Sequence, residues 1–160
     1  MRHISRTTQQ GFTLIEAVVT MMLMATLIAL AAPQLQDFTA NQAMRTASFN
    51  LTSALLMARS EAVKRNSQVT ITPAGGQWSN GWTTVDSGGA ALGNGSPFKS
   101  NVTVDNAPAP PDSITFNNTG RVVAVGVLQL QLSRQLRSNI IYRCITLDPS
   151  GLPRTTTEAC

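Results

Sequence analysis

Residues 11–32 of the chain are Gly-Phe-Thr-Leu-Ile-Glu-Ala-Val-Val-Thr-Met-Met-Leu-Met-Ala-Thr-Leu-Ile-Ala-Leu-Ala-Ala. The 21 residues from Phe12 to Ala32 contain one charged side chain, Glu16. At about 1.5 Å of rise per residue, a helix of this length spans roughly 30 Å, which is the thickness of one bilayer core. The stretch therefore predicts one membrane-spanning helix.

The residues before this stretch carry Arg2 and Arg6 and no acidic side chain. Positive residues next to a membrane helix favour the cytoplasmic side. We therefore expect Met1 in the cytoplasm and everything after Pro33 on the other side of the membrane.

Three interpretations of the segment are open. A secretory signal peptide would be cut at the small-x-small site Ala29-Leu30-Ala31. Glu16 inside its apolar core, and an amphipathic pattern that continues after Pro33, are unusual for a signal peptide. An uncleaved signal anchor would keep Glu16 as an interfacial carboxylate near a helix end. The third interpretation treats Gly11 as the end of a short leader.

This third interpretation comes from a resemblance. A short basic leader followed by Gly11-Phe12-Thr13-Leu14-Ile15-Glu16 resembles the start of type IV pilins and type II secretion pseudopilins. The resemblance implies that prepilin peptidase cuts between Gly11 and Phe12 and that Phe12 is then N-methylated. It also implies that Glu16 sets the register of assembly against the N-terminal amine of a neighbouring subunit. A carboxylate in hydrocarbon costs about 2.5–3.5 kcal/mol or more, so Glu16 needs such a partner.

After Pro33 the apolar residues recur at three- and four-residue steps, which is typical of an amphipathic helix. These positions are Met44, Ala47, Leu51, Ala54, Leu55, Ala58 and Ala62. We expect one helix, kinked near Pro33 and ending near Arg65, with Glu61 and Arg65 paired at i and i+4. Residues 58–66 resemble the helix end of the GspH/FimT branch of minor pilins and pseudopilins.

Strand signals separated by turn residues follow the helix. They cover residues 68–72, 82–85, 101–104, 114–116, 128–132 and 140–147, and Gly93-Asn94-Gly95 is expected to be loop. The fold class expected is α+β and type IV pilin-like, with a long, kinked N-terminal helix packed on an antiparallel sheet. Its parts would be a leader over residues 1–11, a transmembrane helix half over 12–32 and a globular domain over 33–160.

The composition excludes several kinds of site. The only histidine, His3, lies in the expected leader, so the mature chain could build neither a histidine-based catalytic triad nor a histidine metal site. The loop acids Asp86, Asp105, Asp112 and Asp148 fall on different predicted loops. We expect no enzymatic activity, no cofactor and no metal.

The two cysteines, Cys144 and Cys160, enclose residues 145–159. A disulfide there would contribute about 3 kcal/mol by the chain-entropy account, and two free buried thiols are the alternative. The pairing resembles the C-terminal disulfide loop of type IV pilins, and this favours a pilus subunit over a secretion pseudopilin.

The resemblance implies a minor pilin that joins a pilus or its priming and tip complex. Its partners would be other major and minor pilins, prepilin peptidase and inner-membrane lipid. The protein would sit in the bacterial inner membrane with its globular domain in the periplasm, and then reach the pilus and cell surface. The alternative is a GspH-like minor pseudopilin of a type II secretion system that does not bind DNA.

A possible second role is the binding of DNA during natural transformation, which FimT-type pilins perform through a Gly-Arg-x-Arg motif. The matching residues here are Gly151-Leu152-Pro153-Arg154, so only Arg154 retains a motif arginine. Residues 121–160 hold five basic and two acidic side chains, a net charge of +3, whereas residues 12–120 have a net charge of −1. Arg154, Arg143 and Arg137 are therefore the candidate contacts to phosphates.

Overall fold

The computed structural model describes residues 11–105, 109–136 and 138–160. The chain divides into two compact units, Met1–Asp37 and Phe38–Cys160, and helix α1, Leu14–Arg65, contributes to both. The helix ends at Arg65, where the amphipathic pattern predicts its end. Pro33 lies within α1, and the kink expected there stays a prediction.

The first unit is helical from Leu14 onward. The hydroxyl groups of Thr20 and Thr26 donate to the carbonyl oxygens of Ala17 and Leu23, at 2.9 Å and 2.8 Å. These polar groups are therefore satisfied within the helix itself, which an apolar environment requires. The most apolar 18-residue window of α1 has a mean hydropathy of 2.3 and none of it is buried, so the helix is long and apolar enough to cross a membrane.

The second unit is built around the buried face of α1. Six of the seven positions identified by their spacing lie in the core, while the seventh, Ala54, is partly buried against it. The six are Met44, Ala47, Leu51, Leu55, Ala58 and Ala62. The small alanines let the strands approach the helix closely, and the predicted amphipathic pattern is confirmed.

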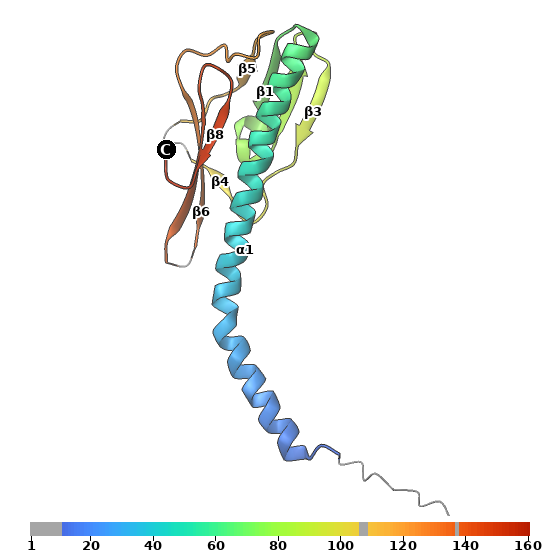
Figure 1. Cartoon of the computed structure of the whole chain (residues 1–160), viewed down its shortest axis with the longest axis vertical. Helices are drawn as coiled ribbons and strands as arrows, with labels where there is room; N and C mark the ends of the chain where they lie inside the picture. Colours follow the sequence, from blue (N-terminus) through green and yellow to red (C-terminus); the bar gives the residue numbers. More distant parts are fainter. Residues whose placement is uncertain (1–10, 106–108, 137) are drawn as a thin grey trace, which may run out of the picture. The chain divides into compact units, whose positions relative to one another are not determined.

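The strands form two four-stranded antiparallel sheets, of order β3-β2-β1-β5 and β4-β6-β7-β8. Figure 1 shows β3 on one side of α1 and β6 and β8 on the other. The strands are β1 Val69–Pro73, β2 Trp82–Asp86, β3 Ala91–Gly95, β4 Thr103–Val104, β5 Ile114–Phe116, β6 Leu128–Gln135, β7 Ile140–Leu147 and β8 Pro153–Thr156. Two short 3-10 helices, η1 Ala74–Gly76 and η2 Trp78–Asn80, precede β2. The expected long helix and antiparallel strands are confirmed, but the strands form two sheets and not one.

The expectation that Gly93-Asn94-Gly95 is loop is wrong, because these residues belong to β3. Gly95 pairs with Trp82 on β2, and a Cβ at Gly95 would lie 2.1 Å from the Trp82 ring. The glycine is therefore needed to seat the tryptophan, which is only 5% exposed. This requirement comes from packing between strands and leaves no local strand signal.

Strand β8 was also not predicted. It pairs with β7 from Cys144↔Thr156 to Leu147↔Pro153. The hydroxyl groups of Thr155 on β8 and Thr52 on α1 lie 3.2 Å apart and share a hydrogen bond. Long-range pairing therefore makes this polar segment a strand.

Candidate functional site

The N-terminal site contains Gly11, Phe12 and Glu16. Gly11 and Phe12 precede the helix and are exposed, Phe12 to 82%. Glu16 is in the first turn of α1. Across residues 11–105, 109–136 and 138–160, the Glu16 carboxylate has no hydrogen-bond or ion-pair partner. The side chain is thus available for a group from outside the chain.

Thr13 caps the helix that carries Glu16. Its Oγ1 accepts a hydrogen bond from the Glu16 backbone N–H at 3.3 Å. The spacing Thr-x-x-Glu is that of a capping box, in which the threonine satisfies one of the free N–H groups at the start of a helix. The cap was not predicted above, although both residues lie within the string that suggested the cleavage site.

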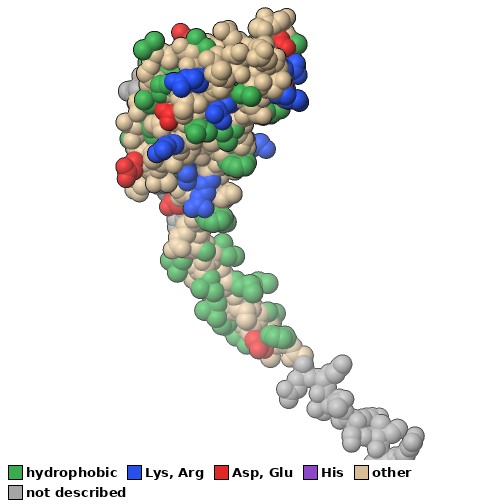
Figure 2. All heavy atoms as spheres, turned by 45° about the horizontal axis from the view of Figure 1, so that its top comes forward, with side chains coloured by type: hydrophobic (Ala, Val, Ile, Leu, Met, Phe, Trp, Pro, Cys, Tyr) green, Lys and Arg blue, Asp and Glu red, His purple; other side chains and the backbone are tan. Residues whose placement is uncertain are grey.

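The rest of the N-terminal segment presents apolar side chains to its surroundings. Figure 2 shows hydrophobic side chains covering the visible face of this helical segment. The exposed side chains include Leu14, Ile15, Met21, Met22, Leu23, Met24, Leu27, Ile28 and Leu30. Exposed apolar surface of this extent marks a contact with lipid or with other proteins.

The C-terminal site begins with a disulfide between Cys144 and Cys160, whose Cα atoms are 5.0 Å apart. The backbone N–H of Cys160 donates to Gln131 Oε1 at 2.8 Å, and Gln131 Nε2 donates to Asp105 Oδ2 at 2.9 Å. These bonds attach the end of the chain to the sheet of β6 and β7.

The structure separates the candidate arginines. Arg143 lies two residues before the core residue Ile145 on β7. Side chains two residues apart in a strand share a face, so Arg143 points to the side of the sheet that faces α1. Arg154 pairs with Thr146, between Ile145 and Leu147, and so points to the opposite face, where it is exposed. The third candidate, Arg137, lies outside the described residues. Arg143 and Arg154 therefore do not form a single phosphate-binding surface.

Arg143 instead lies near Arg45 of α1, which is not among the predicted site residues. Both line a hollow of about 490 Å³ between α1 and the strands β7 and β8. The pKa of Arg143 is lowered, first because the guanidinium is partly buried and second because of the positive charge of Arg45. Nothing in the local sequence pairs these two residues.

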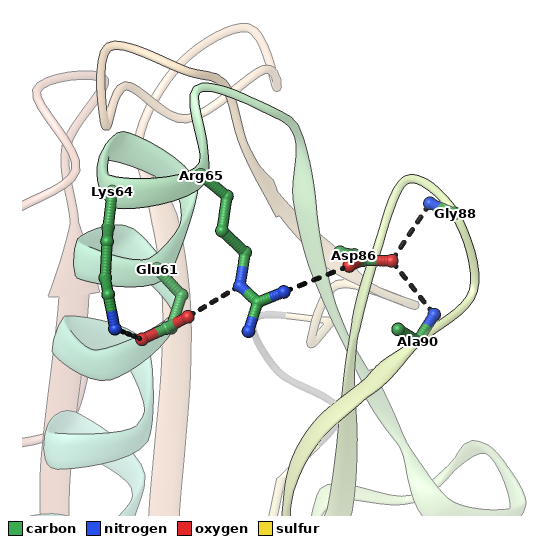
Figure 3. Close-up of polar contacts among 6 residues, drawn as sticks. All are labelled: Glu61, Lys64, Arg65, Asp86, Gly88 and Ala90. Atoms are coloured by element: carbon green, nitrogen blue, oxygen red, sulfur yellow. Dashed lines mark hydrogen bonds and ion pairs between the residues drawn. The ribbon is translucent and has the colours of Figure 1, made fainter.

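A second set of charged side chains, Glu61, Arg65 and Asp86, joins the C-terminal end of α1 to the β2–β3 turn (Figure 3). Glu61 Oε2 accepts a hydrogen bond from Arg65 Nε at 2.7 Å, which confirms the predicted pair. Arg65 Nη1 also lies 3.4 Å from Asp86 Oδ2, while Asp86 Oδ1 accepts the backbone N–H groups of Gly88 and Ala90, each at 2.9 Å. Arg65 therefore links the helix end to the turn.

Because Glu61 is paired with Arg65, we expect the fold to lose stability in acid. The hydrogen bond from Arg65, more than the nearby charge of Lys64, holds the pKa of Glu61 below its ordinary value of 4.5. Because the folded-state pKa is the lower one, the stabilisation is present above the unfolded-state pKa and disappears as the pH falls through the folded-state pKa. We expect Glu61→Gln to reduce the drop in the urea unfolding midpoint between about pH 7 and about pH 3.

The matched control for this prediction is Glu158→Gln, at an exposed position near the chain end. It should leave the acid dependence almost unchanged. An equal effect of the two substitutions would show that the Glu61 pair does not stabilise the fold.

A long apolar N-terminal helix that continues into an α+β domain of antiparallel strands is the architecture of type IV pilin-like proteins. The sequence profile described as type II transport protein GspH matches residues 47–151, which is more than half of the chain. The chain belongs to this family. The prokaryotic N-terminal methylation motif matches residues 6–32, the region that contains Gly11, Phe12 and Glu16.

The fold is similar to that of the type IV minor pilin FimU from Pseudomonas aeruginosa. One crystal structure of FimU has a TM-score of 0.60 and 22% sequence identity, over 76% of this chain and 92% of FimU. A second crystal form gives a TM-score of 0.57 and 20% identity, over 72% of this chain and 96% of FimU. No curated protein matches the chain significantly. The protein is thus a minor pilin or pseudopilin with a pilin-like anchor and fold, and such proteins are structural subunits that assemble with other pilins.

Proposed function

We propose that the protein is a minor pilin that enters the inner membrane through residues 12–32 and is then incorporated into a type IV pilus or its tip complex. The main support is the exposed apolar helix, which is unburied over its whole most apolar window and has one carboxylate at its start. A helix of this kind is stable in lipid or against the helices of other subunits. The globular domain then faces the periplasm.

Glu16 sets the register of assembly in this proposal. Its carboxylate is unpaired within the described residues and would be costly in lipid, so a positively charged partner stabilises it there. The methylated N-terminal amine of Phe12 on a neighbouring subunit is such a partner. The match to the methylation motif supports this assignment of Phe12.

Mass spectrometry of the N-terminus of membrane-extracted protein tests the proposal. We expect a mature chain that begins at Phe12 and carries one additional methyl group, because prepilin peptidase cuts after Gly11. Deletion of the peptidase gene is the control and should leave the leader attached.

Either of two other termini would contradict this result. A chain that starts at Ala32 would identify a signal peptide, and one that keeps residues 1–11 in a strain with active peptidase would identify an uncleaved anchor.

A pseudopilin of a type II secretion system is the alternative, and the match to the GspH profile favours it. The C-terminal disulfide favours a pilus subunit by its resemblance to the type IV pilin loop. Deleting the gene and scoring piliation, protein secretion and transformation separately distinguishes the two machines.

Binding of DNA is a second candidate function. It is favoured by the net charge of +3 over residues 121–160 and by the two arginines that line one hollow. Affinity that rests on a few phosphate contacts is independent of sequence and decreases with salt. Because Arg154 lies on the opposite face of its sheet, the hollow with Arg45 and Arg143 is the better site to test.

A further inference from the structure

The hollow between α1, β7 and β8 has an unbalanced positive charge. Arg45 and Arg143 both line it, and its lining contains no acidic residue. In the described part of the chain the ion pairs involve Lys64 and Arg65, and neither Arg45 nor Arg143 takes part in one. Two like charges brought together without an acid repel each other, so an anion between them would relieve the repulsion.

The hydroxyl groups around the hollow are mostly occupied. Those of Thr46 and Ser48 each donate at 3.0 Å to a carbonyl oxygen of α1. The hydroxyls of Thr52 and Thr155 share one hydrogen bond, which leaves a single O–H available between them. Two guanidinium groups, the side-chain amide of Gln42 and one hydroxyl are thus the donors that line the hollow, a set that fits an anion with several acceptor oxygens.

An exposed aromatic ring completes the rim. Phe49 lines the hollow one helical turn after Arg45 and is 70% exposed. Exposed aromatic side chains beside arginines that bind phosphates stack on the unpaired bases of single-stranded nucleic acids. The volume of about 490 Å³ falls in the ordinary range for small-ligand sites, about 300–1,000 Å³.

From these observations we infer that the hollow is a nucleotide-binding site, with the phosphate between the Arg45 and Arg143 guanidinium groups and the base against Phe49. The inference rests on the DNA-binding candidate above and specifies its chemistry as single-stranded. A paired base inside a duplex does not present its face to Phe49. The nucleotide is either free or one unit of a strand, and the experiment distinguishes the two.

The test measures the binding of a fluorescent oligodeoxythymidine to the full mature chain in detergent micelles, by anisotropy over a range of salt. We expect Arg45→Gln, Arg143→Gln and Phe49→Ala each to weaken binding about tenfold. Each arginine substitution should also lower the salt slope by about 0.7, the value for one phosphate contact on a single strand. Phe49→Ala should leave the weaker binding of a duplex unchanged.

Two matched controls accompany these variants. Arg154→Gln removes a positive charge from the opposite sheet face, and Leu56→Ala removes an exposed apolar side chain one heptad after Phe49 on α1. Both should bind within about twofold of the parent, because exposed side chains outside an interface contribute little. Competition by thymidine monophosphate at low concentration identifies a free nucleotide as the ligand, whereas binding of the oligonucleotide alone identifies a strand.

Unfolding measurements separate loss of the site from loss of the fold. Because Arg45 and Arg143 repel each other, replacing either one should leave the urea midpoint unchanged or raise it, while nucleotide binding decreases.

Three outcomes would overturn the inference. If Arg154→Gln abolishes binding while Arg45→Gln and Arg143→Gln do not, DNA is bound on the opposite face and the DNA-binding candidate survives. If the parent binds neither probe at low salt, both the inference and that candidate fail, and the assembly function remains. If the arginine variants bind normally but no longer cross-link to other pilins, the hollow holds a carboxylate of a neighbouring subunit.

Discussion

Glu16→Ala is expected to leave the protein in the membrane and to reduce its recovery in sheared filaments about a hundredfold or more. Losing the carboxylate makes the helix more apolar, so insertion is maintained. The amine of the neighbouring subunit, in contrast, loses its partner in a low-dielectric environment, and breaking a buried ion pair costs about 3–5 kcal/mol. Quantitative immunoblotting of the membrane and filament fractions measures both effects.

Glu16→Gln and Thr20→Ala are the matched controls for this prediction. The amide keeps the shape of the side chain but not its charge, so it should behave like alanine. Thr20 donates only to Ala17 of its own helix, and its replacement should leave incorporation unchanged. Normal recovery of Glu16→Ala in filaments would show that the carboxylate does not set the register.

Gly151→Ala is expected to destabilise the globular unit by about 3 kcal/mol or more. Gly151 has a φ of +81° in the turn between β7 and β8, and a Cβ there would lie 2.1 Å from the carbonyl oxygen of Gly120. That oxygen also accepts a hydrogen bond from Arg59 Nε of α1 at 3.0 Å. The helix and two loops therefore meet where the methyl group would lie, and the backbone has to move.

Gly89→Ala is the control for the conformational part of this effect. Gly89 has the same φ of +81°, but nothing lies within 4 Å of the position of its Cβ. Its replacement should cost only the strain of a positive φ, about 1–2 kcal/mol. Fluorescence of the buried Trp78 and Trp82 during urea unfolding reports both variants, and equal losses would show that the contact with Gly120 does not matter.

The sequence alone determined the features that depend on local periodicity. The apolar run from Phe12 to Ala32 and the three- and four-residue spacing that follows it predicted a helix that ends at Arg65, as observed. Strand-forming residues set between turn residues predicted β5 and β7 with the bounds Ile114–Phe116 and Ile140–Leu147. The candidate residues Gly11, Phe12 and Glu16 also came from one contiguous string. Each of these signals lies within one helix or one strand.

Other features were decided by tertiary structure. The glycines of β3 form a strand because Trp82 packs over Gly95, and β8 forms because it pairs with β7. The division of the strands into two sheets likewise depends on which strands meet.

The positions of the basic residues also depend on tertiary structure. Alternation along β7 places Arg143 beside the core residue Ile145, but the position of Arg154 depends on its pairing with Thr146. Arg45 and Arg143, nearly a hundred residues apart, line one hollow only because α1 packs on the sheet of β7. Side chains along a strand alternate between the two faces of the sheet, and the pairing with the partner strand sets the face on which each side chain lies. The sequence of one strand does not specify this face. The two arginines therefore come together, and lie apart from Arg154, only in the folded chain.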